Sequence, residues 1–249
     1  MKTVIIPLPD RDFDVTEVSV PWRILTRAGH RVVFATERGG NVPEGDPKLL
    51  TGVIFGQLGA DPEPKAFYGE MQHDASFCAP IAWRDINVDA TDAFILPGGH
   101  APGMRQYLEG RELQQKVAAF WALGRPIGAI CHGTVVLART KDPATGESVI
   151  AQRRTTCLPK FMERSAYFLT AWKLGKYYRT YPEYVEDEVK RALRDPKRQF
   201  ERGPLGLARG TNLDDAPAFV VEDGNYVSAR WPGDAYLFAK KMLYKITKA

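Results

Sequence analysis

Short apolar, β-branched runs alternate with longer amphipathic segments, and this alternation constrains the fold more than any other feature of the chain. Between the first two runs, Val18, Trp22 and Leu25 recur at helical spacing within residues 15–28, before Gly29. That order is a βαβ unit, so we expect an α/β protein with a largely parallel sheet and helices on both faces. The strand-like runs lie at residues 3–8, 31–35, 93–96, 126–130 and 218–221.

Three further helices are expected, and two of them are closed by a glycine, Gly124 or Gly175. They lie at residues 111–123, 161–174 and 233–246.

The 249 residues are 44% hydrophobic, which is enough for one core, so we expect a single domain over residues 1–249. Residues 37–80 are rich in Gly, Pro and Asp, and we expect there a long irregular excursion that forms a partial lid. Residues 176–206 are expected to be a helical insertion. The charges of its run 186–194 alternate in sign, which is typical of a solvated helix face.

The charge balance excludes a polycationic surface, because 34 basic residues face 30 acidic ones and leave a net charge of +4. We therefore expect no nucleic-acid partner. No apolar stretch approaches the roughly 20 residues that span a bilayer, and residues 1–9 lack the pattern of a secretion signal, so no membrane partner is expected. The three cysteines form no disulfide framework, which favours a reducing, cytoplasmic setting.

The segment Cys131-His132-Gly133 lies between a buried strand at residues 125–130 and the opening of a helix at residues 134–138. A strand-to-helix junction with small neighbours is typical of a nucleophile elbow. We expect the Cys131 thiol to be exposed above the sheet edge, with its pKa lowered by the amides of the following helix. The alternatives are that Cys131 is a small buried hydrophobe and that His132 is an ordinary hydrogen-bonded histidine.

A second glycine-rich turn, Pro97-Gly98-Gly99-His100, ends another strand and could present backbone N–H groups as an oxyanion hole or be a plain turn. This turn and three other elements together resemble the PfpI/ThiJ superfamily, whose class I glutamine-amidotransferase-like fold implies a flavodoxin-like α/β sheet. Within that superfamily the chain is similar to the larger, chaperone and glyoxalase III-like branch. The other elements are Glu17 four residues before Pro21, the segment 129–133 and the segment 228–234.

This resemblance implies that Cys131 is the nucleophile, that Glu17 hydrogen-bonds the thiol and that His132 is the general acid/base. Gly99 and the backbone of His132 would supply oxyanion donors. Glu163, about thirty residues after the cysteine, would complete a triad by orienting His132. From the sequence alone, Glu17 and Glu163 are equally well explained as acids in the first turn of a helix.

Glutaminase activity is not expected. The four histidines are His30, His73, His100 and His132, so none follows the elbow, and Trp231-Pro232-Gly233 stands where the amidotransferase His and Glu would be. His30 and His73 have no convincing partner ligand, so we expect no metal and no cofactor.

We therefore expect an enzyme that acts on a small carbonyl or acyl substrate, such as the glyoxalase III-like conversion of methylglyoxal to lactate, with Cys131 forming a hemithioacetal. A cysteine peptidase or related thiol hydrolase is the nearest variant. A stress-related holdase or redox sensor with an oxidisable Cys131 is the alternative from another class. The resemblance also implies a homodimer.

Overall fold

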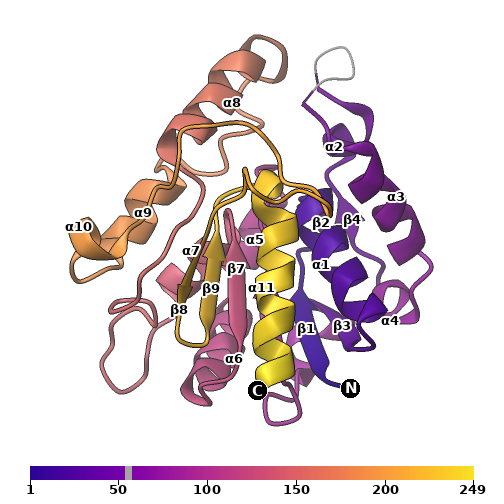
Figure 1. Ribbon diagram of the computed structural model, residues 1–249, viewed down its shortest axis with the longest axis vertical. Coiled ribbons are helices and arrows are strands. Elements are labelled where there is room, and N and C mark those ends of the chain that lie inside the picture. The colour runs from indigo at the N-terminus through magenta and orange to yellow at the C-terminus, as the bar shows by residue number, and fades with distance from the viewer. Residues whose placement is uncertain (54–57) are drawn as a thin grey trace.

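The structure is a computed structural model that describes residues 1–53 and 58–249, and its centre is a seven-stranded sheet (Figure 1). Only the last two strands pair antiparallel, and the other neighbours are parallel. This is the largely parallel, flavodoxin-like sheet that the sequence predicts. The strand order is β5 (Ile81–Ala82), β3 (Arg31–Thr36), β1 (Thr3–Pro7), β6 (Ala93–Leu96), β7 (Ile127–Ile130), β9 (Tyr226–Ala229) and β8 (Val220–Asp223).

The central strands are buried on both faces, because helices cover the sheet on each side. Every residue of β6, β7 and β9 is buried, which is why β6 and β7 carry continuous apolar runs rather than alternating ones. The run of β9 is interrupted by Ser228, whose Oγ accepts the N–H of Thr156. β1 pairs with β3 on one side and with β6 on the other, and β6 pairs with β7. The carboxyl ends of these strands therefore meet at one edge of the sheet, where sites of α/β proteins form.

Helices α1 (Val15–Arg27) and α11 (Ala235–Lys248) pack side by side on one face, and α6 (Arg111–Ala122) and α7 (Gly133–Arg139) cover the other (Figure 1). α1 begins at Asp14, whose carboxylate accepts the N–H groups of Thr16 and Glu17. The shorter elements are β2 (Arg11–Phe13), β4 (Glu44–Gly45), α2 (Pro47–Thr51), α3 (Pro62–Met71), α4 (Ala75–Cys78), the 3₁₀ turn Trp83–Asp85 and α5 (Met104–Leu108).

The prediction that residues 37–80 are irregular is wrong for about half of the segment, because it contains β4, α2, α3 and α4. Its prolines and aspartates begin helices instead of interrupting them: Asp46 caps α2, and Pro47 and Pro62 occupy the first helical positions of α2 and α3. Residues 54–57 of the expected lid lie outside the described residues.

The expected helical insertion is present as α9 (Val185–Arg191) and α10 (Pro196–Gln199), reached through α8 (Lys160–Leu174), which stands beyond the sheet edge (Figure 1). The prediction of a solvated charged face fails at Glu186. Its side chain is buried, accepts the N–H of Lys160, and forms ion pairs with Lys190 and Arg202. The charges of this run therefore stabilise the insertion by joining α9 to the start of α8 and to the segment after α10.

At the carboxyl end, the strand expected at residues 218–221 is the first arm of a hairpin, and its second arm, β9, was not predicted. Gly224, with a φ of +60°, turns the chain between β8 and β9. Within the described ranges, no helix is both long and apolar enough to cross a membrane.

Candidate active site

Cys131 lies at the sharp turn between β7 and α7, with a φ of +57°. A non-glycine residue in this region costs roughly 1–2 kcal/mol, and such strain is retained mainly where the surrounding structure imposes it. Here the constraint is close packing, because a Cβ on Gly133 would lie 2.0 Å from the carbonyl oxygen of Leu96. The segment therefore has the backbone of a nucleophile elbow.

The Cys131 side chain is 0% exposed, so the expectation of a thiol exposed above the sheet edge is wrong. The turn does carry it to the carboxyl edge of β7, but the neighbouring turn after β6 and the first turn of α1 cover it. Burial raises the pKa of the Cys131 thiol well above its usual range, and the charges of Glu17 and Asp14 add to this rise. The expected lowering of the thiol pKa is therefore also wrong for this closed arrangement.

Glu17 is brought to the thiol by the first turn of α1, and it is fully buried. Its Oε2 accepts the N–H of Gly98 at 2.7 Å, and its Oε1 has no hydrogen-bond partner among the described residues. A Cβ on Gly98 would lie 2.9 Å from both the Cys131 Cβ and Glu17 Oε2, so the carboxyl and the cysteine meet across this glycine.

Burial favours the protonated form of the Glu17 carboxyl group. Burial raises its pKa well above the usual range, and the charge of Asp14 raises it further, whereas the hydrogen bond from Gly98 lowers it. Burial also raises the pKa of Asp14, to about 6, so Asp14 is ionised at neutral pH. A neutral acid beside a buried sulfur can donate a proton to it or relay one.

His132 also lies beside the sulfur, with its Nδ1 3.6 Å from Cys131 Sγ. Burial lowers the pKa of His132 well below its usual range, and the charge of His100 adds to this effect, so the imidazole is neutral at neutral pH. Its Nε2 lies 3.4 Å from the Oγ1 of Thr180, which donates its own proton to the carbonyl oxygen of His100 at 2.6 Å. Thr180 can therefore only accept from Nε2–H, and this leaves the lone pair of Nδ1 facing the thiol.

Glu163 is not brought to His132, so the predicted orienting contact is wrong. Its Oε1 pairs with Arg179 at 3.2 Å and its Oε2 accepts the N–H of Val185 at 3.0 Å. Burial raises the pKa of Glu163 to about 7, which fits a carboxyl enclosed by the insertion rather than one exposed at a helix start. No sequence signal points to Thr180, because a threonine inside an insertion has no motif.

The turn after β6 brings His100 to the same place. Its ring packs edge-on against that of His132 with the centroids 4.8 Å apart, and against Tyr178 at 5.8 Å. Gly99, the expected oxyanion donor, sits so close to β2 that a Cβ would lie 2.7 Å from the carbonyl oxygen of Asp12. The backbone nitrogen of His132 would lie 2.7 Å from a Cβ on Gly98, so the turn of residues 98–99 faces the elbow amide.

One group of side chains in the described ranges has donors suited to a metal ion. The ligand atoms of His100, Cys131 and His132 all lie within 4.8 Å of one another. Thiolate and imidazole are ligands that zinc accepts. His30 instead accepts the N–H of Lys2 near the surface, and His73 is exposed. The expectation of no metal stays a prediction.

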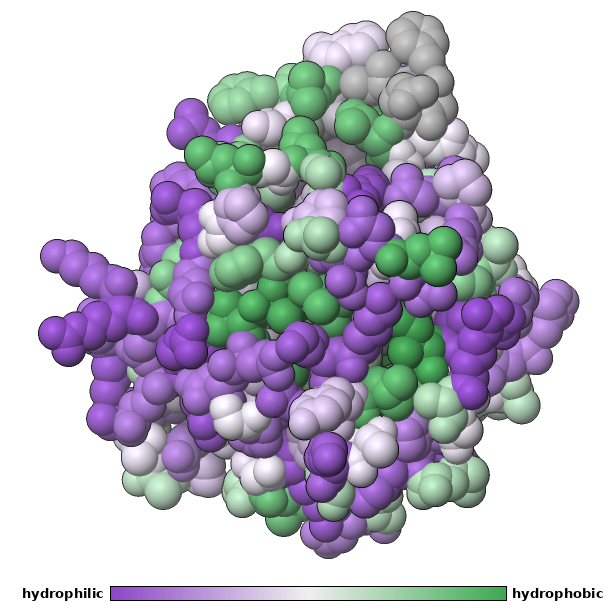
Figure 2. Space-filling model, in the orientation of Figure 1, coloured by the Kyte–Doolittle hydropathy of each residue, from purple (hydrophilic) through white to green (hydrophobic). Residues whose placement is uncertain are grey.

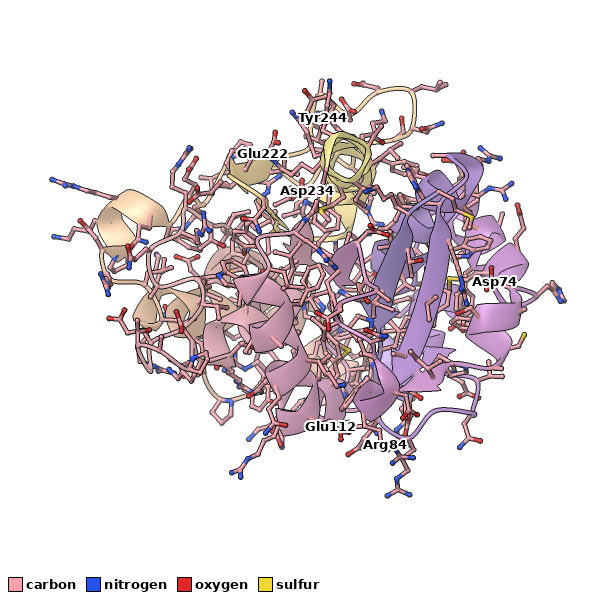
Figure 3. All side chains as sticks on the ribbon, turned by 90° about the horizontal axis from the view of Figure 1, so that it is seen from below. Asp74, Arg84, Glu112, Glu222, Asp234 and Tyr244 are labelled. Carbon is pink, nitrogen blue, oxygen red and sulfur yellow. The ribbon has the colours of Figure 1, made fainter. Side chains whose placement is uncertain are left out.

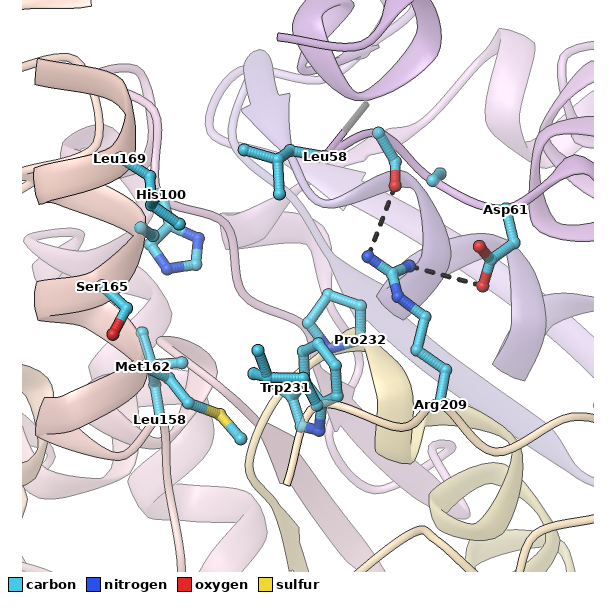
Figure 4. A pocket seen from close by; sticks show the side chains of 14 residues that line it. Leu58, Asp61, His100, Leu158, Met162, Ser165, Leu169, Arg209, Trp231 and Pro232 are labelled. Atoms are coloured by element: carbon cyan, nitrogen blue, oxygen red, sulfur yellow. Dashed lines mark hydrogen bonds and ion pairs between the residues drawn. The ribbon is translucent and has the colours of Figure 1, made fainter. Parts of the chain in front are cut away.

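The segment 228–234 contains Trp231-Pro232-Gly233, where an amidotransferase would place its His and Glu. The residues on either side of these three stabilise the fold. Arg230 and Asp234 form a buried bidentate ion pair, with nitrogen–oxygen distances of 2.8 and 2.9 Å. Figure 3 places Asp234 inside the molecule beside α11, whereas Arg84 and Glu112 project from the surface. Between the two paired residues, Trp231 and Pro232 line a cavity of about 440 Å³ next to His100 (Figure 4).

Comparison with known proteins assigns the chain to a family. A family profile described as ThiJ/PfpI family-like matches residues 8–204. The chain belongs to the ThiJ/PfpI family. This ThiJ/PfpI protein is 28% identical to an uncharacterized protein of Schizosaccharomyces pombe, over 98% of this chain and 84% of that one. It is 23% identical to a deglycase of Pyrococcus abyssi, over 93% and 92% of the two chains.

Solved structures show the same fold for this ThiJ/PfpI protein. The Rapid Encystment Protein of Francisella tularensis superimposes with a TM-score of 0.71 and 20% identity, and the match covers 99% of each chain. Glyoxalase III from Candida albicans superimposes with a TM-score of 0.69 and 17% identity, over 98% of this chain and 97% of that one.

Proposed function

We propose that this ThiJ/PfpI protein is a cofactor-independent cysteine enzyme that acts on a small carbonyl compound, with the glyoxalase III-like conversion of methylglyoxal to lactate as the reaction to test. The observation that carries the proposal is the strained Cys131 turn, which holds a thiol beside the buried carboxyl of Glu17, whose pKa is raised, and beside the lone pair of His132 Nδ1. The names of the relatives, a deglycase and a glyoxalase III, agree with chemistry on reactive carbonyls.

In the first step the thiol adds to the aldehyde carbon. A bond forms between Sγ and that carbon, the carbonyl π bond breaks, and the oxygen receives a proton from Glu17 while His132 Nδ1 takes the thiol proton. Because the thiol proton is transferred as the bond forms, no free thiolate is required, and the raised pKa of Cys131 disfavours such a thiolate. The backbone N–H groups of Gly99 and His132 are proposed to stabilise the developing oxyanion.

In the second step the Glu17 carboxylate takes the proton of the former aldehyde carbon and delivers it to the adjacent keto carbon, while protonated His132 gives a proton to the keto oxygen and receives the hydroxyl proton of the first carbon in return. The first carbon is oxidised to the level of a thioester and its neighbour is reduced to an alcohol, so no external oxidant or reductant is required. Water then attacks the thioester, the sulfur leaves as a thiol, and lactate is released. Methylglyoxal and water together account for every atom of the product.

The test is consumption of methylglyoxal without glutathione, with lactate measured as the product. Wild-type protein should form lactate, Cys131→Ala should form none, and Cys157→Ala should retain activity. Cys157 is a matched control because it is a cysteine of the same chain that is equally buried. Lactate formation by Cys131→Ala, or none by the wild type, would refute the proposal.

The redox-sensor alternative depended on an accessible thiol of lowered pKa, and neither property is found at Cys131. We therefore do not propose it. The expected homodimer and the cytoplasmic location stay predictions.

A further inference from the structure

The cavity beside His100 is larger than a small dicarbonyl compound needs. Its volume of about 440 Å³ falls in the range of pockets that enclose a whole organic ligand. α8 forms one wall, and Trp231, Pro232 and residues 58–61 form the other, as Figure 4 shows. The cavity therefore has room for more than the reacting carbons.

The walls of this cavity are mainly apolar. α8 and the residues before it contribute Leu158, Met162 and Ala166 to the lining. Leu158 and Met162 face the ring of Trp231 and Pro232 across the space (Figure 4). A surface of this kind stabilises an apolar ligand in proportion to the area removed from water, and offers little to a small hydrated aldehyde.

The mouth of the cavity is apolar as well, which is unusual for a surface in contact with water. Leu58 is 46% exposed, Leu169 56% and Leu207 67%, and all three line the cavity. Figure 2 shows hydrophobic side chains gathered at this upper end of the molecule, over α8. A ligand that covered these side chains would remove them from water.

Two of the polar side chains that line the cavity, Arg209 and Asp61, pair with each other. Arg209 stacks on the ring of Trp231 at 5.4 Å and pairs with Asp61 at 3.5 Å, with Gly59 accepting a further hydrogen bond (Figure 4). This arrangement holds the indole ring as a flat wall opposite α8.

The cavity leads to the thiol through His100. This side chain lines the cavity, and its ligand nitrogen lies within 4.8 Å of Cys131 Sγ. A carbonyl group at the His100 end of the cavity would therefore be separated from the buried sulfur by this one side chain, with the rest of the molecule between α8 and Trp231.

We propose that the preferred substrate of this protein is a 2-oxoaldehyde that carries an apolar body, such as an aromatic ring, and that methylglyoxal is a poorer substrate of the same site. The inference rests on the proposed function and adds the substrate class. Burial of a ring-sized apolar group improves kcat/KM by about tenfold or more, so phenylglyoxal should exceed methylglyoxal by at least that factor.

The test compares the ratio of kcat/KM for phenylglyoxal to that for methylglyoxal in matched variants. Ala166→Leu narrows the cavity and should lower the ratio by about tenfold, whereas Ala171→Leu, on the same helix and equally half-buried but outside the cavity lining, should leave it unchanged. Ser165→Leu, at an exposed lining position, should also lower the ratio and cannot disrupt the core. A wild-type ratio near one, or equal effects of the Ala166 and Ala171 changes, would overturn the proposal.

Binding to Cys131→Ala separates failure of this proposal from failure of the proposed function. Acetophenone and acetone carry a ketone that needs no reaction for binding, and tryptophan fluorescence reports occupancy beside Trp231. We expect acetophenone to bind at least about tenfold more tightly than acetone, with the advantage reduced by Ala166→Leu in the same background. Equal binding of the two ketones would reject the apolar substrate class, whether or not the wild type produces lactate.

Discussion

The first turns of α1 and α8 each carry a buried glutamate, but the two carboxyl groups have different surroundings. Burial raises the pKa of both Glu17 and Glu163. Glu17 uses one oxygen to accept the N–H of Gly98, and its Oε1 has no partner among the described residues. Glu163 uses both oxygens, one for Arg179 and one for the backbone of Val185.

The difference follows from where each helix leaves the sheet. α1 starts at the carboxyl edge, between the ends of β1 and β6, so its first turn faces the elbow. α8 begins after a long excursion from α7 and packs against α9, so its first turn holds the insertion. A carboxyl with an unused oxygen beside a thiol can move a proton, whereas one with both oxygens occupied holds chain segments together.

The largest effect is expected at Glu17. Glu17→Gln retains the buried volume but cannot relay a proton, so turnover of the preferred 2-oxoaldehyde should fall by about 10²-fold or more, with thermal stability close to that of the wild type. Steady-state kinetics and thermal unfolding measure the two quantities. Turnover within threefold of the wild type would place Glu17 with Glu163 as a structural residue.

A smaller effect is expected at Thr180, which takes the place beside His132 that Glu163 was predicted to fill. Thr180→Val removes the acceptor for His132 Nε2–H, so the tautomer with a lone pair on Nδ1 is no longer favoured, and turnover should fall by about tenfold. Thr180→Ser keeps the hydroxyl and should restore it. Nitrogen NMR of the imidazole reports the tautomer, and an unchanged tautomer in the valine variant would contradict this role.

The smallest effect on turnover is expected at Glu163. Glu163→Gln should change turnover less than about threefold, because neither oxygen reaches His132. The variant should instead alter the pH dependence of stability. With a pKa of about 7 in the folded state against 4.5 for the ordinary group, Glu163 binds more protons when folded, so its contribution is complete below pH 4.5 and is lost as the pH rises toward 7.

Denaturant titrations from pH 4.5 to 8 test this sign. The free energy of unfolding of the wild type should fall relative to Glu163→Gln by up to about 3 kcal/mol across that window. A difference that is constant with pH would show that the carboxyl titrates alike in the folded and unfolded states.

Features fixed by local sequence were predictable. Three predicted features each follow from a short run of residues, and the structure has all of them: the neighbouring strands β6 and β7, the helix after Asp14 and the junction at Cys131. The contact between the Glu17 carboxyl and the cysteine also followed, because adjacent parallel strands bring their carboxyl ends to one edge.

Features fixed by contacts between distant segments were not predictable. The burial of the thiol depends on how closely the turn at Gly98 and the first turn of α1 pack over it, and no residue near Cys131 signals this. The position of Thr180 beside His132 depends on the path of the insertion, which has no regular period. Glu163 was misjudged because its chain distance from the cysteine fits a family pattern, whereas Arg179 and Val185 determine its contacts.

The contact of Gly133 with the Leu96 carbonyl determines how a chain of this kind can diverge. Any side chain at residue 133 would push the turn that carries the cysteine away from β6. Substitution of Gly133 is therefore not tolerated at this junction. The cavity walls on α8 have no such restriction, since Ser165 and Leu169 are exposed. Point substitutions on this helix can therefore change which ligand the cavity binds, while Cys131, Glu17 and His132 stay unchanged.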